Sequence, residues 1–314
     1  MQVIFSDEQK KQQSLEYAFK HLQRLMKPGV IKATFVHDIF VHFFKYCCKA
    51  KEQHLCHDLQ PYIVYLSSSQ SGALCASYTI KNANAKEQKI MVRLLDEFGM
   101  YNLFKSPSAY IVICSLLNYV SLEGLLKNRV IKCINENIED FIEDKFAYRV
   151  ILCALTCSGS LIGIPPDTID KMKLIDHNFS AEMNKDIKLS LINHMAKKIA
   201  TFLVSNTSKL LDKKVLQNLL LNFLPASGKY CKPLVKAIFD SMSHQFNLVS
   251  FWDSGDSHFF IKSFLSKDSF ANNNAISLEE DDCNDKFADL LCKYFIENDL
   301  SGICSSNRGM FSLI

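Results

Sequence analysis

The residues whose chemistry matters most in the first half of this chain are lysines and arginines. Five of them carry positive charge that attracts phosphate whatever base lies beside it. These are Lys86, Lys89, Arg93, Lys145 and Arg149. We interpret them as contacts to the backbone of a nucleic acid. The alternative stays open that they only keep helix faces in water, because a net charge of +3 is a weak electrostatic signature.

Charge is distributed unevenly along the chain. Residues 1–152 hold 19 Lys and Arg against 15 Asp and Glu, residues 153–248 hold 12 against 7, and residues 249–314 hold 5 against 11. The three segments therefore carry +4, +5 and −6. A polyanion would meet the first two-thirds of the chain more favourably than the last third.

Motifs that mark common enzymes do not occur in the sequence. There is no Walker loop, dinucleotide-binding fingerprint or metalloprotease motif. The run CSGS, from Cys157 to Ser160, is not a nucleophile elbow, because no strand pattern precedes it. We therefore expect a protein that is not an enzyme and that uses neither a cofactor nor a small-molecule substrate.

Cysteines and histidines gather in one short stretch, which raises the question of zinc. They are Cys47, Cys48, His54, Cys56 and His57. Their spacing matches no closed structural-zinc pattern, so we predict no metal site and interpret them as core thiols and surface histidines. His37 and His42 stand in a very apolar stretch, and we interpret them as packing residues rather than catalysts.

The remaining cysteines fit a reducing compartment. The 12 cysteines show no framework spacing, and many lie in apolar runs, so we expect free, buried thiols. The N-terminus becomes polar within six residues, which argues against a secretory signal. No apolar run has the length that a membrane span needs, so we expect no membrane partner.

The elements that position these residues are predicted to be helices. Only 10 Gly and 7 Pro interrupt the chain, which favours helices joined by short loops over an all-β fold. Residues 135–156, NENIEDFIEDKFAYRVILCALT, hold a helix end, a turn and a second helix. The same pattern recurs, and the equivalent residues Leu74, Tyr110 and Arg149 are 36 and 39 positions apart. This period predicts an all-α fold, an α-solenoid of antiparallel helix pairs.

Two helical-repeat regions are predicted, at residues 1–156 and 179–314. Between them, residues 157–178 hold Gly, a Pro-Pro pair and few apolar positions, and we interpret them as a surface excursion. A second polar and acidic excursion is predicted at 267–285. Both are expected to be the most mobile internal segments. The last repeat, which ends at Ile314 within a helical pattern, is interpreted as incomplete.

Several segments, in one order along the chain, resemble a known family. YLSSSQSGALCASYTI, IEDKFAYRVILCAL, DSGDSHFFIKSFL and SSNRGMFSL are similar to segments of the Penguin, or Puf-A, class of Pumilio-related proteins. The likeness extends from about Phe35 to Ile314. The chain departs from the family at Leu74, where the family has arginine, and at Ala147 and Tyr148, where it has glycine and arginine.

The resemblance implies a superhelix of Puf-type, armadillo-like repeats in residues 1–156 and of CPL-like repeats in residues 179–314. It implies residence in the nucleus, within the nucleolus, and partners that include RNA, DNA and pre-ribosomal particles. The function it implies is sequence-tolerant RNA binding in ribosome biogenesis, at pre-rRNA processing, or in translational regulation.

In Puf-type repeats one helix face reads one base per repeat, and the stacking places correspond to five residues here. They are Leu74, Tyr110, Arg149, His258 and Arg308. Tyr, Arg and His can lie flat against a base, at about 1–3 kcal/mol each, whereas Leu cannot. The edge-reading places include Ala73, Ala109 and Ile113, which carry no donor or acceptor, so we expect no base code.

The sequence leaves two classes of function. The first is RNA binding through nine residues: Lys86, Lys89, Arg93, Tyr110, Lys145, Tyr148, Arg149, His258 and Arg308. The second is an armadillo-like scaffold that grips another protein and binds no nucleic acid. A clustered basic face would favour the first, and an apolar or mixed-charge groove would favour the second. Replacing Lys145 and Arg149 together is expected to leave stability nearly unchanged, since both side chains are predicted to be exposed.

Overall fold

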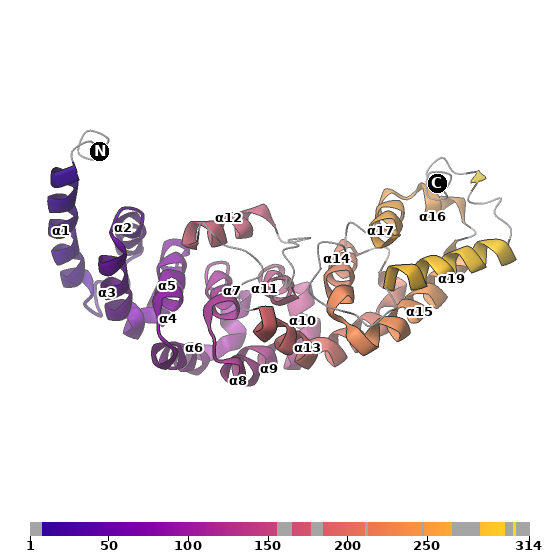
Figure 1. Cartoon of the computed structure of the whole chain (residues 1–314), viewed down its shortest axis with the longest axis horizontal. Coiled ribbons are helices and arrows are strands. Elements are labelled where there is room, and N and C mark those ends of the chain that lie inside the picture. Colours follow the sequence, from indigo (N-terminus) through magenta and orange to yellow (C-terminus); the bar gives the residue numbers. More distant parts are fainter. Residues whose placement is uncertain are drawn as a thin grey trace. The chain divides into compact units, whose positions relative to one another are not determined.

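The computed structural model describes residues 8–155, 165–176, 185–210, 213–246, 248–265, 283–298 and 304–305. All the regular secondary structure in these residues is helical (Figure 1), which confirms the predicted all-α class. The chain forms two compact units. Unit 1 comprises Met1–Ile134, Glu143–Cys153 and Pro165–Phe179, and unit 2 comprises Asn135–Ile142, Ala154–Ile164 and Ser180–Ile314.

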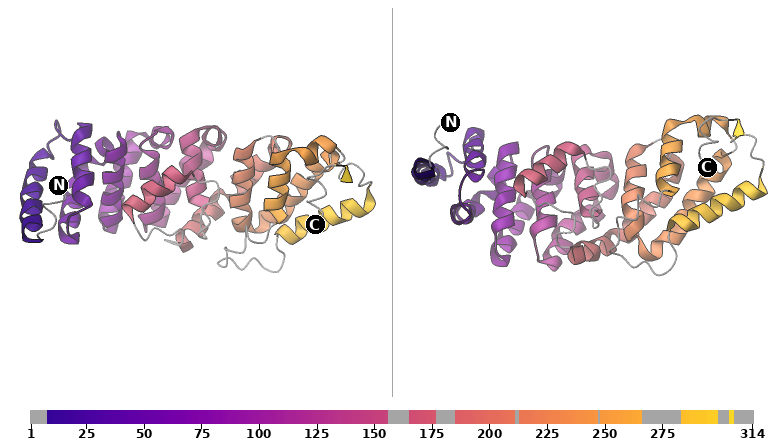
Figure 2. Two further views of the ribbon diagram at one scale, coloured as in Figure 1. Left: turned by 90° about the horizontal axis from the view of Figure 1, so that it is seen from above. Right: turned by 45° about the horizontal axis from the view of Figure 1, so that its top comes forward.

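Unit 1 is built from helix pairs in two layers. The α7 layer consists of α2 (Thr34–Phe44), α5 (Gln70–Asn82), α7 (Tyr110–Tyr119) and α11 (Lys145–Leu155). The α6 layer consists of α3 (Lys49–Leu59), η2 (Gln60–Tyr62), α4 (Ile63–Leu66), α6 (Ala85–Lys105), α8 (Glu123–Leu126), η3 (Lys127–Ile131) and α9 (Lys132–Glu136). In the first layer α2 contacts α5 and α5 contacts α7, and in the second α4 contacts α6 and α6 contacts η3 (Figure 1 and Figure 2). A first helix, α1 (Glu8–Leu25), packs on α2 and α3.

Polar side chains in the turns begin the helices of both layers. The hydroxyl of Ser69 accepts a hydrogen bond from the N–H of Gly72 at 3.0 Å and caps α5. Asp144 accepts from two N–H groups of α11 at 2.8 and 2.9 Å. Asn84 and Glu87 form a reciprocal capping box at the start of α6. Caps of this kind each stabilise a helix by about 1 kcal/mol, so the polar turns in the sequence do define the helix starts.

His37 fastens α2 to the turn before α5. Its ring is fully buried, with Nε2 2.7 Å from the Ile31 carbonyl oxygen and Nδ1 2.7 Å from the Ser69 hydroxyl. A neutral ring satisfies both contacts, because one nitrogen donates to the carbonyl and the other accepts from the hydroxyl. The backbone around the start of α5 is packed so tightly that a Cβ on Gly72 would stand 2.2 Å from the carbonyl oxygen of Leu66. The predicted packing role of His37 is confirmed.

Helix α7 is enclosed on every side. All ten of its residues are buried, and its sequence YIVICSLLNY has no charged side chain. A helix that is apolar all round has to be covered all round. Helices α5 and α6 cover two of its sides, and α12 (Pro166–Ile175) covers another.

Helix α12 corrects the prediction that residues 157–178 are an excursion with few apolar anchors. Residues 165–176 are the described part of that segment, and they form a helix that packs on α5 and α7. Thr168, Met172 and Ile175 are buried at the spacing of one helix face. The Pro-Pro pair, interpreted as a loop signal, begins the helix, where proline is favourable. The mobility of the segment stays a prediction.

Unit 2 is also helical. Its elements are α10 (Ile138–Glu143), α13 (Lys185–Ser205), η4 (Thr207–Lys209), α14 (Lys214–Phe223), η5 (Leu224–Ala226), η6 (Gly228–Tyr230), α15 (Cys231–Met242), η7 (Ser243–Gln245), α16 (Val249–Asp253), α17 (Gly255–Leu265) and α19 (Cys283–Glu297). The ring of Phe246 contacts Phe251 and Trp252 of α16 and Tyr294 of α19, and so links these two helices. The fully buried indole of Trp252 donates to the Phe246 carbonyl at 2.5 Å.

Two predictions for the C-terminal region fall on residues that the structure leaves undescribed. The second excursion, 267–285, lies outside the described residues except for 283–285, which begin α19. The last predicted helix, with Arg308, also lies outside them. The CPL-like character of residues 179–314 stays a prediction.

Nine cysteines in the described residues carry thiols rather than disulfides. Four are buried, as predicted, and three are exposed, which corrects the prediction: the buried ones are Cys56, Cys75, Cys114 and Cys153, and the exposed ones are Cys48, Cys292 and Cys304. Cys231 takes part in a disulfide, which also differs from the prediction. Cys56 and Cys75 are buried where α3 meets α5. Burial raises the pKa of the Cys47 thiol to about 12 and raises the pKa values of Cys56 and Cys75 above their usual range. A raised pKa keeps a thiol protonated at neutral pH and therefore unreactive.

Candidate nucleic-acid interface

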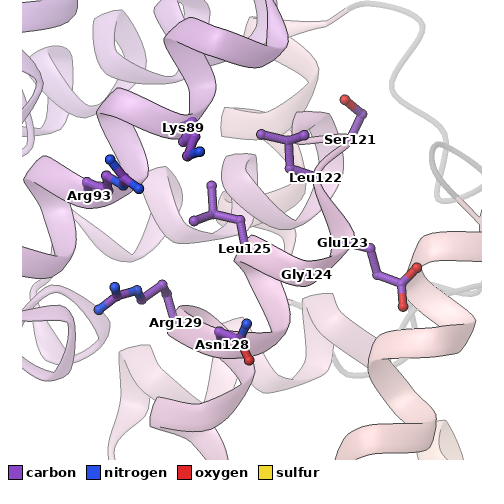
Figure 3. A pocket seen from close by; sticks show the side chains of 9 residues that line it. All are labelled: Lys89, Arg93, Ser121, Leu122, Glu123, Gly124, Leu125, Asn128 and Arg129. Atoms are coloured by element: carbon purple, nitrogen blue, oxygen red, sulfur yellow. The ribbon is translucent and has the colours of Figure 1, made fainter.

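A basic pocket opens between α6 and the turn that leads into η3 (Figure 3). It has a volume of about 540 Å³ and is lined by Lys89, Arg93, Ser121, Leu122, Glu123, Gly124, Leu125, Asn128 and Arg129. Lys89 and Arg93 stand one turn apart on α6, and Arg129 comes from η3; all three are exposed. Figure 3 shows these three cations toward one side of the pocket and the Glu123 carboxylate at the opposite side.

The buried side chain of Gln88 holds the walls of this pocket together. Its amide nitrogen donates to the carbonyl of Ala83 at 3.2 Å and to that of Tyr119 at 3.0 Å. Its amide oxygen accepts from the N–H of Ser121 at 3.3 Å. A buried amide with three partners is satisfied and fixed. It therefore holds the turn at 119–121 against α6, beside Lys89.

The three cations differ in how far they are neutralised. Arg129 donates from Nη1 to the Asp96 carboxylate at 2.5 Å. Lys89 and Arg93 make no hydrogen bond or ion pair with the residues that the structure describes. A guanidinium has five N–H donors in a planar fork, so Arg93 offers all of them and Arg129 keeps several. The pocket can therefore bind an anion such as phosphate through several charge-assisted hydrogen bonds.

The sequence-predicted site residues of unit 1 are divided between its two layers. Lys86, Lys89 and Arg93 are exposed on α6. The others lie in the α7 layer, on α7 and α11: Tyr110, Lys145, Tyr148 and Arg149. The structure thus brings Lys89 and Arg93 together and separates them from the residues predicted to stack on bases.

The expectation that Arg149 is exposed is wrong. Tyr110, Tyr148 and Arg149 are buried, with exposed fractions of 0%, 9% and 8%. Lys145 is exposed as predicted, and its ammonium lies 5.7 Å from the centre of the Phe146 ring. Tyr110 and Arg149 are buried because α12 lies directly on them, which no spacing in the sequence indicates.

Arg149 is the centre of a hydrogen-bonded cluster beneath α12. Its Nη1 donates to the Asp167 carboxylate at 2.8 Å. The same nitrogen donates to the hydroxyls of Tyr110 and Thr168 at 3.1 and 3.3 Å. Lys171 donates to the Tyr110 hydroxyl at 3.4 Å and pairs with Asp167 at 3.7 Å. Arg149 and Lys171 each lie 5.5 Å from the centre of the Tyr110 ring, so two cations contact one aromatic ring.

The ion pair in this cluster keeps its charges. Burial opposes the charge of Arg149, but hydrogen bonds to Tyr110 and Asp167 outweigh it and raise the pKa of Arg149. Burial also opposes the charge of Asp167, and Arg149 and Lys171 outweigh it and lower the pKa of Asp167. At neutral pH the side chains of Arg149 and Asp167 are therefore both ionised.

The other end of α12 is held by α5. The Tyr78 hydroxyl donates to the Leu174 carbonyl at 2.5 Å, and Lys81 donates to the Ile175 carbonyl at 3.2 Å. Lys81 also pairs with Asp176 at 3.3 Å. The last carbonyls of a helix have no partner within the helix and favour a nearby positive charge. Residues of α5, α7 and α11 thus anchor both ends of α12.

The remaining two predicted residues belong to unit 2. His258 is half-buried on α17 of unit 2, and Arg308 lies outside the described residues. Sequence reasoning missed Arg129 and Asn128, which belong to no stacking place of a repeat. The run Lys127-Asn128-Arg129, soon after Gly124, was the available signal.

No metal site is evident in the described part of the chain, where no three His, Cys, Asp or Glu residues gather closely enough to hold an ion. His57 instead contacts the Glu87 carboxylate at 2.8 Å, and His54 lies 3.5 Å from Asp58. The described helices include none with the length and apolar character of a membrane span.

The chain is similar to a set of curated proteins and to a set of solved structures. No family model matches the chain. Pumilio homolog 3 of Rattus norvegicus is 21% identical over 208 residues, which are 64% of this chain and 32% of the relative. Pumilio homolog 3 of Mus musculus is 20% identical over 230 residues, which are 71% of this chain and 35% of the relative. The chain therefore spans about a third of the length of the curated relatives that it matches.

Solved structures give a longer match. The crystal structure of human Puf-A in complex with DNA has a TM-score of 0.75 and 17% identity, covering 99% of this chain and 60% of that chain. A second crystal structure of human Puf-A has a TM-score of 0.71 and 17% identity, covering 95% and 58%. The resemblance predicted from the sequence is confirmed: this chain has the all-α, Puf-type helical-repeat fold of Puf-A.

Proposed function

We propose that this chain is a non-catalytic protein that binds single-stranded RNA through phosphates at the pocket of Lys89, Arg93 and Arg129. The observation that carries the proposal is the convergence of three exposed cations from two elements on one open pocket. Lys89 and Arg93 have no acidic partner among the described residues, so their charge can act on a ligand. Support also comes from the human Puf-A crystal structure that contains DNA.

The lining of the pocket favours contacts to the backbone over the reading of bases. None of its nine lining residues is aromatic, so no ring there can stack on a base. Ser121 and Asn128 add hydrogen-bonding groups that suit phosphate and sugar oxygens. Binding is therefore expected to tolerate changes of sequence, to extend to single-stranded DNA, and to weaken steeply with salt.

Two double variants, matched in charge, test this proposal. Lys89→Gln with Arg93→Gln removes two cations from the pocket, and Lys45→Gln with Lys49→Gln removes two exposed cations near the junction of α2 and α3. Binding of a labelled oligouridylate is followed by fluorescence anisotropy over a range of salt concentrations. Each phosphate of a single strand that the protein no longer neutralises lowers the slope of log K against log salt by about 0.7, so the slope for the pocket variant should fall by about 1.4. An equal decrease in both variants would mean that the binding surface lies elsewhere.

The cellular role that accompanies this activity is in ribosome biogenesis, at pre-rRNA processing in the nucleolus, or in translational regulation. Pre-ribosomal particles are the expected partners. The likeness to Puf-A and to Pumilio homolog 3 is the support for this part of the proposal. Sedimentation of the tagged chain with pre-ribosomal particles, and its loss in the pocket variant, is the expected result. A chain that stays outside the nucleus and free of such particles would contradict it.

A scaffold for another protein is the second candidate, and exposed apolar side chains on α2 favour it. Phe35 and Ile39 are 60% and 42% exposed and stand one turn apart on the same helix face. A scaffold of this class would show no salt-dependent binding of RNA. The anisotropy titration of the unmodified protein therefore separates the two candidates.

A further inference from the structure

Helix α12 lies on the two residues of the α7 layer that the sequence predicts to stack on bases. It packs on α5 and α7 (Figure 1), and its Asp167 accepts a hydrogen bond from Arg149 of α11. Tyr110 is fully buried beneath it, with its hydroxyl 3.1 Å from that of Thr168. A nucleic acid therefore cannot reach Tyr110 or Arg149 while α12 stays docked.

The surface beneath α12 combines aromatic rings with cations. Its members come from three neighbouring helices of the layer: Tyr78 and Lys81 from α5, Tyr110 from α7, and Phe146 and Arg149 from α11. Rings that stack bases, next to cations that neutralise phosphates, are what proteins use to bind single strands. The chemistry of this surface therefore suits the same class of ligand as the exposed pocket.

Apart from the Lys171 ammonium, which contacts Tyr110, the polar groups of α12 that meet this surface accept hydrogen bonds through oxygen. The Asp167 carboxylate meets Arg149, and the carbonyl oxygens of Leu174 and Ile175 meet α5. A phosphate presents anionic oxygens of the same kind, and a guanidinium binds carboxylate and phosphate with similar geometry. The side chain of Asp167 is 52% exposed, whereas that of Arg149 is 9% exposed. Solvent thus reaches the pair from the side of the anion.

Little apolar surface holds α12 in place. Met172 and Ile175 are its only fully apolar buried side chains, whereas all ten residues of α7 are buried. A helix of about ten residues is marginal in water without tertiary contacts. The ion pairs Arg149–Asp167 and Lys81–Asp176 therefore supply much of its attachment, and a polyanion competes with attachments of that kind.

We propose that α12 is an intramolecular competitor of single-stranded nucleic acid, which blocks the surface of Tyr110 and Arg149 until phosphates of the strand replace Asp167. The inference rests on the proposed function, since it requires the same class of ligand. The exposed pocket binds the strand whether α12 is docked or not. The α7 layer adds contacts only after α12 has left, so the docked helix limits the affinity of the whole chain.

Two variants of the full chain with equal net charge test this inference. Asp167→Lys removes the shared carboxylate and places a cation against Arg149 and Lys171, so α12 should undock. Asp170→Lys makes the same charge change at an exposed position of α12 that has no hydrogen bond or ion pair with the described residues. At low salt the Kd for labelled oligouridylate should be roughly tenfold lower for Asp167→Lys than for Asp170→Lys, because α12 is undocked in a larger fraction of the Asp167→Lys molecules. Equal Kd values would overturn the proposal.

The Lys89→Gln, Arg93→Gln variant separates this result from that of the pocket. A gain from Asp167→Lys when the pocket variant binds no worse than wild type would support the role of α12 and refute the pocket. No gain over Asp170→Lys, together with weak binding by the pocket variant, would support the pocket and refute the role of α12. Absence of binding in every variant would refute both.

Hydrogen exchange on the unmodified chain gives a measurement that does not depend on how any variant folds. Adding oligouridylate at low salt should speed exchange of the amides of residues 168–175, while those of α14 in unit 2 keep their rates. Faster exchange in α12 alone supports the proposal. Unchanged or slower exchange in α12, with the oligouridylate bound, overturns it.

Discussion

Replacing Arg149 by alanine should destabilise unit 1 by about 2–3 kcal/mol. The substitution removes a buried donor to Asp167, and a hydrogen bond to a charged group contributes about 1.5–3 kcal/mol. Because the Asp167 side chain is 52% exposed, water screens the ion pair, and its loss should cost only about 1 kcal/mol of stability. The two methylenes beyond Cβ are buried with the rest of the side chain and add about 0.8 kcal/mol each.

Urea unfolding followed by far-UV circular dichroism measures this destabilisation, with Lys145→Ala as the control on the same helix. Lys145 is exposed, so its replacement should change the free energy of unfolding by less than about 0.5 kcal/mol. The single tryptophan, Trp252, lies in unit 2, and its fluorescence should shift less than the dichroism does. If both alanine variants unfold at the same urea concentration as wild type, Arg149 is not held as the structure shows.

Three further substitutions test the packing of unit 1. Gly72→Ala should destabilise by about 1–3 kcal/mol in thermal unfolding, since a Cβ there would stand 2.2 Å from the Leu66 carbonyl oxygen; Gly29→Ala, in open space, should be neutral, and equal destabilisation would contradict this. Tyr119→Phe should raise the urea midpoint by the equivalent of about 1 kcal/mol, because the buried hydroxyl has no hydrogen-bond partner among the described residues; a lower midpoint would reveal one. Burial lowers the pKa of His37 from 6.5, so the unfolded chain takes up this proton first and the associated stability, full above about pH 6.5, is lost as the pH falls; His37→Gln should flatten that dependence, and an unchanged slope would exclude the ring as its source.

The layered arrangement of unit 1 could be predicted from the sequence because it depends on local signals. Polar turns followed by apolar runs recur, and Leu74, Tyr110 and Arg149 do fall on successive helices of one layer, α5, α7 and α11. Caps and helix periodicity involve residues only three or four positions apart, so a linear sequence contains them.

The position of α12 could not be predicted from the sequence, because it depends on contacts between residues far apart in the chain. The contact of Tyr78 with Leu174 joins residues 96 positions apart, and nothing in their spacing indicates that the segment returns to α5. For the same reason the burial of Arg149 was missed. The pocket is an intermediate case. Lys89 and Arg93 are on one helix, whereas Arg129 comes from η3 and pairs with Asp96 of α6, which is 33 positions away in the sequence.

The buried, protonated thiols of Cys56 and Cys75 make it possible to measure how often unit 1 opens locally. Alkylating reagents attack thiolates, so they can modify these two residues only when α3 separates from α5. Cys48 is exposed and is modified from the start, which provides an internal standard. The extent of alkylation of Cys56 and Cys75 relative to Cys48, measured by mass spectrometry, therefore reports how often α3 separates from α5, in a cell extract as well as in buffer.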